Sequence, residues 1–396
     1  MKLIHTADWH LGRTLHKLSL EDFQQEFLNH IVDLTRQEKP DALLLAGDVY
    51  DRAVPSTSAI GMLEDVLLQL TELTRVIMIP GNHDSSTRLG FGSGLFTENL
   101  QIFSKTTHVG RPIVISNDSE TLNVYPVPYL EPDSARRTLS DTIDENGDLS
   151  LLSRSHTAVM EAALRRIDSD LENRKGPAIA MIHAFVAGSV TSDSERDISV
   201  GGSQAVSPAL FASMGSEKPK SRGLSYVAAG HIHRPQQFET AGPIIRYSGS
   251  PLPFSFSEAN DHKSTTILTI ENEDVAVDTI DVPQPYSLHQ RRGTMAELTQ
   301  EVPDWAETGY AHIEVTDVTR PEHLFERIRG VYPKALLIRH TPPVSQVEEV
   351  HAEVEKKRPE DLAREFFALA LGRDVTDEEG DIIDETWRQV LLEEAL

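Results

Sequence analysis

Five short polar clusters, each at the end of an apolar run, constrain this chain more than any other feature of its sequence. The runs cover residues 2–6, 42–46, 76–79, 178–182 and 226–229, and their length and composition predict buried strands. Functional groups in an open α/β sheet gather beyond the carboxyl ends of strands, so we expect the clusters to meet in one crevice. The clusters are Asp8-Trp9-His10, Gly47-Asp48, Gly81-Asn82-His83-Asp84, His183 and Gly230-His231-Ile232-His233.

Helical patterns alternate with these strands. Residues 21–36 and 58–73 carry apolar side chains at spacings of three and four, which is the stripe of a helix packed on a core. A third helical pattern, at about residues 158–171, lies between polar segments and predicts an insertion on the surface. Strands that alternate with helices favour a layered α/β domain, which we expect over residues 1–283.

Two further parts follow a proline-containing segment near residue 283. Residues 309–315, 321–330 and 335–339 predict a strand, a helix and a strand, so residues 284–342 should form a small α+β domain. Residues 345–396 hold short helical patterns, carry a net charge of −10, and are too few to build a core of their own. We expect this C-terminal segment to be helical.

The side chains of the clusters favour a metal site. They are aspartate, asparagine and histidine, a set that suits manganese, iron or zinc, and the chain has no cysteine to offer as a ligand. The ligands are too many for one ion, whereas two ions that share a carboxylate could clamp the attacking and leaving oxygens of a phosphoester. Two cations would also explain how a chain with a net charge of −25 holds a phosphodiester.

Each cluster taken alone has a simpler explanation. An aspartate and a histidine after a strand more often form a turn or a cap, Gly47-Asp48 is a turn dipeptide, and an isolated buried histidine is usually a core residue with a backbone partner. The occurrence of all five clusters together decides between a metal site and these simpler explanations. Five matches in order, each after a predicted strand, favour the metal site.

The series of clusters resembles the calcineurin-like metallophosphoesterase superfamily, and the longer spellings at residues 5–12 and 47–51 resemble its SbcD nuclease family in particular. Residues 194–196, 201–202, 247–251 and 256–258 extend the likeness. The resemblance implies a layered metallophosphoesterase β-sandwich flanked by helices. It further implies that residues 284–342 form a cap that contacts DNA and that residues 345–396 bind an ATPase.

The resemblance also implies the roles of individual residues. His83 would stand beside the scissile phosphate, and Asp84 would orient its ring. Two Mn²⁺ ions per chain are implied, and other divalent first-row metals would suit the same ligands. The first ion would be held by Asp8, His10, Asp48 and His233, and the second by Asp48, Asn82, His183 and His231.

The implied activity is manganese-dependent DNA cleavage, as a 3′-to-5′ exonuclease on duplex ends and an endonuclease on hairpins and single strands. It would take place in a complex with an SbcC-type ATPase during DNA repair, recombination and replication, and the chain would form a homodimer. The lack of cysteine and of long apolar runs favours a cytoplasmic protein that has no membrane partner. The resemblance implies association with the nucleoid.

Three sets of residues are candidates for contacts with partners. An exposed arginine is usually only solvated, and an apolar helix residue fits a monomer core equally well. Exposed aromatic residues in a short tail favour docking on another protein. The DNA candidates are Arg13, Arg52, Arg88 and Arg196, the dimer candidates are Ile60, Leu63, Leu95 and Phe96, and the ATPase candidates are Phe366, Phe367, Leu369 and Leu371.

Two other functions compete with the DNA nuclease. The first is another dinuclear metallophosphoesterase, such as a nucleotidase, a phosphoprotein phosphatase or a cyclic-nucleotide phosphodiesterase, which the metal ligands alone do not exclude. The additional domain and the acidic tail count against it. The second is a scaffold that keeps the fold without catalysis, and the complete set of candidate ligands counts against that.

Overall fold

The computed structural model describes residues 1–117, 120–143, 147–195, 205–214, 223–238, 240–271, 274–343, 361–364, 366–367 and 375–394. Two compact units make up the chain. The first consists of Met1–Gln290, Asp304–His312 and Tyr332–Leu337, and the second of Arg291–Pro303, Ile313–Val331 and Ile338–Leu396. The domain boundaries expected from the sequence, at residues 283 and 342, remain predictions.

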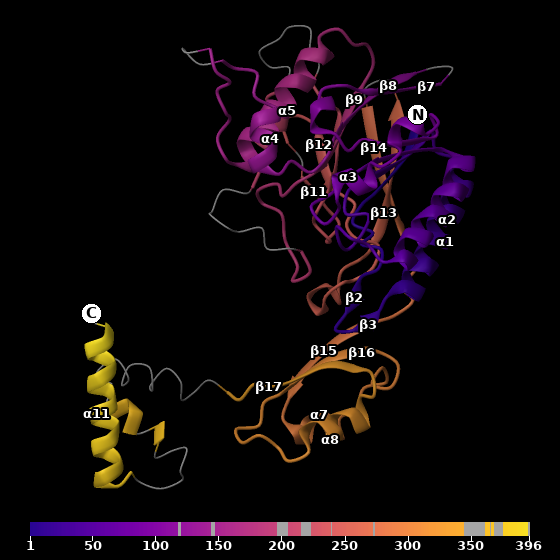
Figure 1. Cartoon of the computed structure of the whole chain (residues 1–396). Coiled ribbons are helices and arrows are strands. Elements are labelled where there is room, and N and C mark those ends of the chain that lie inside the picture. Colours follow the sequence, from indigo (N-terminus) through magenta and orange to yellow (C-terminus); the bar gives the residue numbers. More distant parts are fainter. Residues whose placement is uncertain are drawn as a thin grey trace. The chain divides into compact units, whose positions relative to one another are not determined.

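Two six-stranded sheets form the centre of the first unit (Figure 1). The first sheet has the order β14 (Asp274–Asp281), β13 (Ser264–Glu271), β1 (Lys2–Thr6), β4 (Ala42–Ala46), β5 (Arg75–Ile79) and β6 (Leu100–Ile102). The second has the order β11 (Gln236–Phe238), β12 (Ile244–Tyr247), β10 (Tyr226–Gly230), β9 (Ala178–His183), β8 (Thr121–Val127) and β7 (Ile113–Ser116). Strands β1, β4, β5 and β6 are parallel, as are β8, β9, β10 and β12. All five predicted strands are present in these parallel runs.

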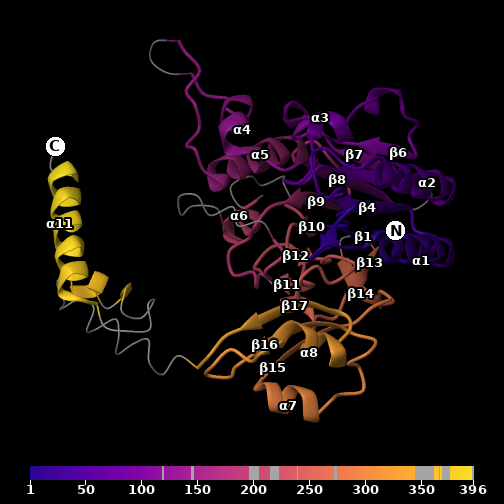
Figure 2. The ribbon, with the colours of Figure 1, turned by 60° about the horizontal axis from the view of Figure 1, so that its bottom comes forward.

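Alternate residues of each strand face different layers of the unit. In β4, Leu44 packs between the two sheets, whereas Leu43 and Leu45 pack against helices. Helices α1 (Glu21–Glu38) and α2 (Thr57–Leu73) cover the outer face of the first sheet. Helices α4 (Pro132–Thr138) and α5 (His156–Leu171) cover the outer face of the second, so the sheets lie between two helical layers in both views (Figures 1 and 2). This is the layered α/β arrangement predicted from the sequence.

The helix α5 is not the surface insertion that we expected. Its residues Val159, Ala163 and Ile167 are fully buried on the second sheet. The polar segments on both sides of the helix suggested a peripheral position, but the spacing of three and four residues along its buried face is that of a core helix. This helix therefore supports the strands that carry His183 and His231.

Shorter elements connect the layers of the first unit. The strands β2 (Thr14–Leu15) and β3 (Leu18–Ser19) form a small hairpin. The short helices are α3 (Ser86–Leu89), η1 (Ser93–Leu95), η2 (Thr106–His108), α6 (Ala209–Ala212) and η3 (Phe256–Glu258).

A third sheet has three strands in the order β15 (Leu288–Gly293), β16 (Tyr310–Val315) and β17 (Ala335–His340). The strands β16 and β17 and the helix α8 (Leu324–Val331) agree with the predicted strand, helix and strand. The strand β15 and the helix α7 (Met295–Gln300) were not predicted, although Thr294 and Glu297 form a capping box at the start of α7. The tail contains α11 (Asp377–Glu394), as its helical pattern predicted. Among the described residues, no helix is long and apolar enough to cross a membrane.

Candidate metal centre

The predicted clusters meet at the carboxyl ends of β1, β4, β5, β9 and β10. Histidine and aspartate side chains form three overlapping buried groups, in each of which the possible ligand atoms lie within 4.8 Å of one another. Asp48 belongs to two of the groups, as expected for a carboxylate shared by two sites. The groups are Asp8, His10 and His233; His10, Asp48 and His83; and Asp48, His183 and His231.

Unusual backbone conformations turn these side chains toward one point. Asp8, His10, Asp48 and His231 have φ angles of 56°, 47°, 47° and 108°, values that residues other than glycine rarely adopt. Each such residue costs on the order of 1–3 kcal/mol, and residues of this kind cluster at functional sites. The amide of His10 donates to the carbonyl of Asp48 at 3.0 Å, which ties two of the turns together.

Glycines make room for the close packing. A Cβ atom on Gly47 would collide with the ring of His183, and one on Gly81 would collide with the carboxylate of Asp48. A Cβ on Gly230 would collide with the carbonyl oxygen of Ala46. The glycines beside the candidate ligands are therefore required by the geometry of the site as well as by the turns.

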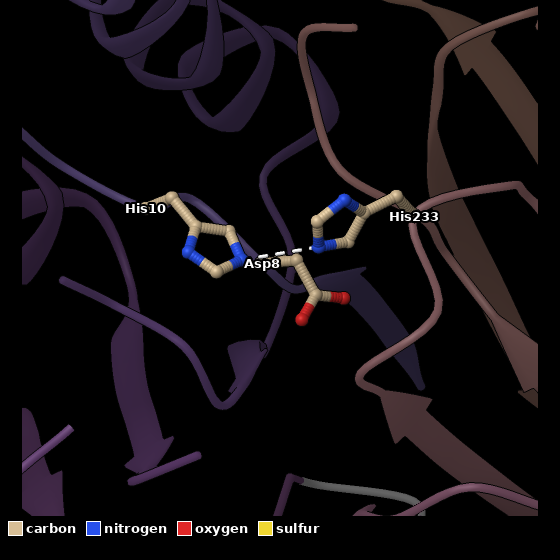
Figure 3. Close-up of side chains that lie close together, drawn as sticks. All are labelled: Asp8, His10 and His233. Carbon is tan, nitrogen blue, oxygen red and sulfur yellow. Dashed lines mark hydrogen bonds between the residues drawn. The ribbon is translucent and has the colours of Figure 1, made fainter. Parts of the chain in front are cut away.

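The first group contains an arrangement that suits a cation. His10 Nε2 and His233 Nε2 lie 3.1 Å apart, with the carboxylate of Asp8 beside them (Figure 3). At most one proton fits between two such nitrogens, so at least one of them directs a lone pair into the site. Burial lowers the pKa of His10 to about 3 and raises the pKa of Asp8 to about 7. A divalent cation would satisfy the lone pairs and compensate the buried carboxylate, so the residues fit a metal ion.

The third group centres on Asp48 and His183. His183 Nδ1 donates to the carbonyl of Ala46 at 2.9 Å, which directs Nε2 to within 3.4 Å of Asp48 Oδ2. Burial alone would lower the pKa of His183, but the charge of Asp48 raises it to about 9. Burial alone would raise the pKa of Asp48, but His183 holds it well below its usual range. Asn82 Oδ1 lies 3.0 Å from His183 Nε2 and from His231 Nδ1, so the amide oxygen joins the same group.

His83 belongs to the remaining group, with His10 and Asp48. Its Nδ1 donates to the carbonyl of Asp51 at 2.8 Å, and its Nε2 lies 4.0 Å from Asp48 Oδ2. We expected Asp84 to orient this ring. Instead, the carboxylate of Asp84 accepts backbone N–H groups from three residues, Gly81, Val49 and Tyr50. Burial, aided by the charge of Asp48, raises the pKa of Asp84 to about 6. Asp84 therefore joins the loops that carry Asp48 and Asn82, and Asp51 positions the ring.

The DNA candidates differ in exposure. Arg13 is mostly buried: it donates to Asp51 Oδ1 and to the carbonyl of Ser194, both at 3.0 Å, and its guanidinium lies over the ring of Phe254. Arg13 therefore links the segments that carry Asp51 and Ser194. Arg52 has an exposed side chain 3.5 Å from Asp51, and Arg88 donates to the carbonyl of Ala53 at 2.9 Å. The fourth candidate, Arg196, lies outside the described residues.

The candidates for dimer and ATPase contacts also differ in exposure. Ile60, Leu95 and Phe96 are exposed, whereas Leu63 is buried in the core of the monomer and offers no exposed contact. Ile60 and Leu63 both lie on α2, where apolar core and surface residues have the same spacing, so the sequence does not separate them. In the tail, Phe366 and Phe367 are exposed, and their ring centroids lie 5.8 Å apart. Leu369 and Leu371 lie outside the described residues.

A buried polar network behind the first group was not predicted. Glu258 and Lys263 form a fully buried ion pair of 2.6 Å, and Glu258 reaches His233 through the hydroxyl of Ser194. Burial alone would raise the pKa of Glu258, but the ammonium of Lys263 holds it well below its usual range. Ser194 and Glu258 belong to segments that carried the sequence resemblance, yet nothing in their local pattern indicates this contact.

Comparisons with known proteins identify the family of the chain. Residues 1–235 match the calcineurin-like phosphoesterase family, and residues 285–370 match the type 5 capsule protein repressor C-terminal domain, also called SbcD_C. The D subunit of the nuclease SbcCD from Staphylococcus epidermidis is 29% identical over 373 residues, which cover 93% of this chain and 92% of that protein.

Solved structures of low sequence identity also match the chain. A dimetal phosphatase from Danio rerio is 11% identical, with a TM-score of 0.42, over 72% of this chain and 97% of that one. A protein of Thermus thermophilus is 13% identical, with a TM-score of 0.40, over 70% of this chain and 98% of that one. The family match, which spans more than half of the chain, confirms the fold class and the kind of enzyme expected from the sequence. The chain belongs to the calcineurin-like phosphoesterase family.

Proposed function

We propose that this chain is a manganese-dependent DNA nuclease that acts with an SbcC-type ATPase. It would remove nucleotides from duplex ends in the 3′-to-5′ direction and cut hairpins and single strands. The observation that carries the proposal is the set of three overlapping buried groups, two of which contain Asp48. The match to a nuclease subunit along 93% of the chain supports a nucleic acid as the substrate.

The positions of the residues support the proposed roles. Bound ions would polarise the phosphate and lower the pKa of the attacking water. One Mn²⁺ would be held by Asp8, His10, Asp48 and His233, and a second by Asp48, Asn82, His183 and His231. His83 would lie beside the phosphate, where it could stabilise the transition state or give a proton to the leaving oxygen.

A substrate comparison with the purified full-length chain tests this function. Linear duplex DNA labelled at either end, a DNA hairpin and p-nitrophenyl phosphate would each be incubated with Mn²⁺, and with Mn²⁺ plus EDTA as the control. We expect DNA cleavage that EDTA abolishes, with little hydrolysis of the small ester. Rapid hydrolysis of nucleotides or small phosphate esters, with intact DNA, would instead identify a nucleotidase or a phosphatase.

We also propose a homodimer, because an apolar groove lies exposed on the first unit. The groove has a volume of about 780 Å³ and lies between α2 and the segment 88–102. The exposed fractions of Phe91 and Leu95 are 84% and 89%, values typical of a site covered by a partner. Leu68, Ile60 and Phe96 also line the groove. A second copy could cover both grooves symmetrically.

We predict that Leu95→Asp combined with Phe96→Asp converts the dimer to a monomer, because each charge would be buried in the apolar contact. Light scattering at micromolar protein concentration gives the mass. The matched control is Val318→Asp, which changes an exposed apolar residue of the second unit and should leave the dimer intact. A wild-type chain that is strictly monomeric would contradict the proposed homodimer.

The tail is proposed to bind the ATPase. We predict that truncation after Pro343 abolishes co-purification with an SbcC-type ATPase. Cleavage of short DNA should be spared, because residues 345–396 carry a net charge of −10 and would repel phosphate. Phe366→Asp combined with Phe367→Asp should weaken the complex strongly, since aromatic anchors contribute about 2 kcal/mol or more each. Phe325→Asp is the control, because Phe325 and Phe367 are both 45% exposed. Unchanged calorimetric affinity after truncation would disprove this role of the tail.

A further inference from the structure

The ion pair between Glu258 and Lys263 lies behind the first group of candidate ligands, and both side chains are fully buried. Burying two charges costs more than their attraction commonly returns. The ammonium of Lys263 uses all three of its hydrogens: it donates to Glu258 Oε2 at 2.6 Å, to Ser250 Oγ at 3.0 Å and to the carbonyl of His233 at 2.8 Å. The pair is thus attached directly to the backbone of a candidate ligand.

A second connection runs through Ser194. Its hydroxyl oxygen lies 2.5 Å from Glu258 Oε1 and 2.5 Å from His233 Nδ1. A carboxylate paired with an ammonium has no proton to donate, so the proton in the 2.5 Å contact with Glu258 comes from Ser194, and Ser192 Oγ, 2.8 Å from Ser194 Oγ, can donate its own proton to that oxygen. The hydroxyl oxygen then accepts a hydrogen bond from His233, which places the ring proton on Nδ1. His233 Nε2 is left with its lone pair directed toward His10.

The remaining polar atoms of His233 are also held. Its backbone N–H donates to Glu195 Oε1 at 2.9 Å, and its carbonyl accepts from Lys263. Of its four polar atoms, only Nε2 faces the first group. His183 differs, because its Nδ1 donates to the main-chain carbonyl of Ala46.

We propose that the buried Glu258–Lys263 pair is a positioning device that, acting through Ser194, fixes the tautomer of His233 and so sets the affinity of the first metal site but not of the second. The part that concerns metal affinity rests on the proposed function. Hydrogen-bond partners behind a ligating histidine commonly change metal affinity by about 10- to 100-fold. Glu258 and Ser194 touch neither metal nor substrate in this assignment.

The substitution Glu258→Gln tests the device by reversing the direction of its hydrogen bonds. The amide oxygen would face the ammonium of Lys263, so the amide N–H would point to Ser194 and turn the hydroxyl proton toward His233 Nδ1. The ring proton of His233 should move to Nε2 and oppose metal binding there. We expect Mn²⁺ affinity at one of two calorimetric sites to fall about 10- to 100-fold, with the other unchanged.

A second readout does not depend on metal or on activity. Histidine side-chain ¹⁵N spectra of the metal-free full-length chain report which ring nitrogen carries the proton, and His233→Gln identifies the signal. The wild type should show His233 protonated at Nδ1, and Glu258→Gln should show it protonated at Nε2. If Glu258→Gln does not fold, Ser194→Ala provides the test, because it removes the link and leaves the ion pair in place.

The matched control is Ser255→Ala. Ser255 Oγ donates to the same Glu258 oxygen at 2.9 Å but does not contact His233, so its removal should leave the tautomer and both affinities unchanged. An unaltered tautomer in Glu258→Gln and Ser194→Ala, or an equal effect of Ser255→Ala, would overturn the proposal. A wild-type chain that binds no Mn²⁺ would instead refute the proposed function, and the spectra would still decide whether the device exists.

Discussion

Replacement of Asp48 by alanine should abolish DNA cleavage by the purified chain. Asp48 is the carboxylate common to two of the buried groups, 3.4 Å from His183 Nε2 and 3.6 Å from His10 Nε2. Its other oxygen accepts the backbone N–H of His83 at 2.8 Å, so the loss also loosens the loop that carries His83. Both proposed metals would lose a ligand at once.

The measurement combines a nuclease assay with metal analysis by mass spectrometry. We expect no cleavage above background and the loss of both ions for Asp48→Ala, against the loss of one ion for Asp8→Ala. Asp33→Ala is the control, since Asp33 is exposed on α1 and paired only with Arg36 in the contacts described. Near-normal cleavage by Asp48→Ala, with contaminating nuclease excluded, would falsify the two-metal site.

The substitution His83→Gln should lower the cleavage rate by about 10²- to 10⁴-fold, the range that a positioned acid or base contributes. Both metals should remain. The hydrogen bond from His83 Nδ1 to the carbonyl of Asp51 fixes the ring, and Nε2 lies 4.0 Å from Asp48 Oδ2, farther than the ring nitrogens of His10 at 3.6 Å and His183 at 3.4 Å. A glutamine amide can keep a donor there but cannot transfer a proton.

The rate of single-turnover cleavage and the metal content should be measured on the same preparation of His83→Gln. The control is His262→Gln, because the side chain of His262 is exposed and its Nε2 lies 3.3 Å from Asp281 Oδ1. If metal occupancy falls in parallel with the rate, His83 is a ligand. The group that His83 forms with His10 and Asp48 is compatible with that outcome, which makes the experiment decisive.

The meeting of the candidate ligands was predictable because their signal is local. Each follows a short buried strand, and parallel strands bring their carboxyl ends to one edge, so the meeting of Asp8 with Asp48 needs only the strand order. The same logic explains the confirmed α/β fold. The prediction for α5 was wrong because the polar segments on both sides of it suggest a surface position, whereas its apolar face packs in the core.

Contacts that depend on loops were beyond reach of the sequence. The carboxylate of Asp84 bonds to Val49 and Tyr50, about 35 residues away, so its nearness in sequence to His83 was misleading. Glu258 and His233 are separated by 25 residues and are joined through Ser194, in a third segment, and through Lys263. No periodic pattern records such a contact, because it follows from how irregular segments pack against each other.

The origin of the ligands in two different sheets has a consequence for the whole first unit. Asp8 follows the first sheet and His231 the second, and the backbone N–H of His231 donates to both oxygens of Asp8 at 3.0 and 3.1 Å. Gly230 lies directly against the carbonyl of Ala46, with no room for a methyl group. Any slippage of one sheet over the other would therefore shear the site. A misplacement of about 1 Å can cost an enzyme a hundredfold in rate. The packing of the apolar layer between the two sheets therefore determines the relative positions of the candidate ligands.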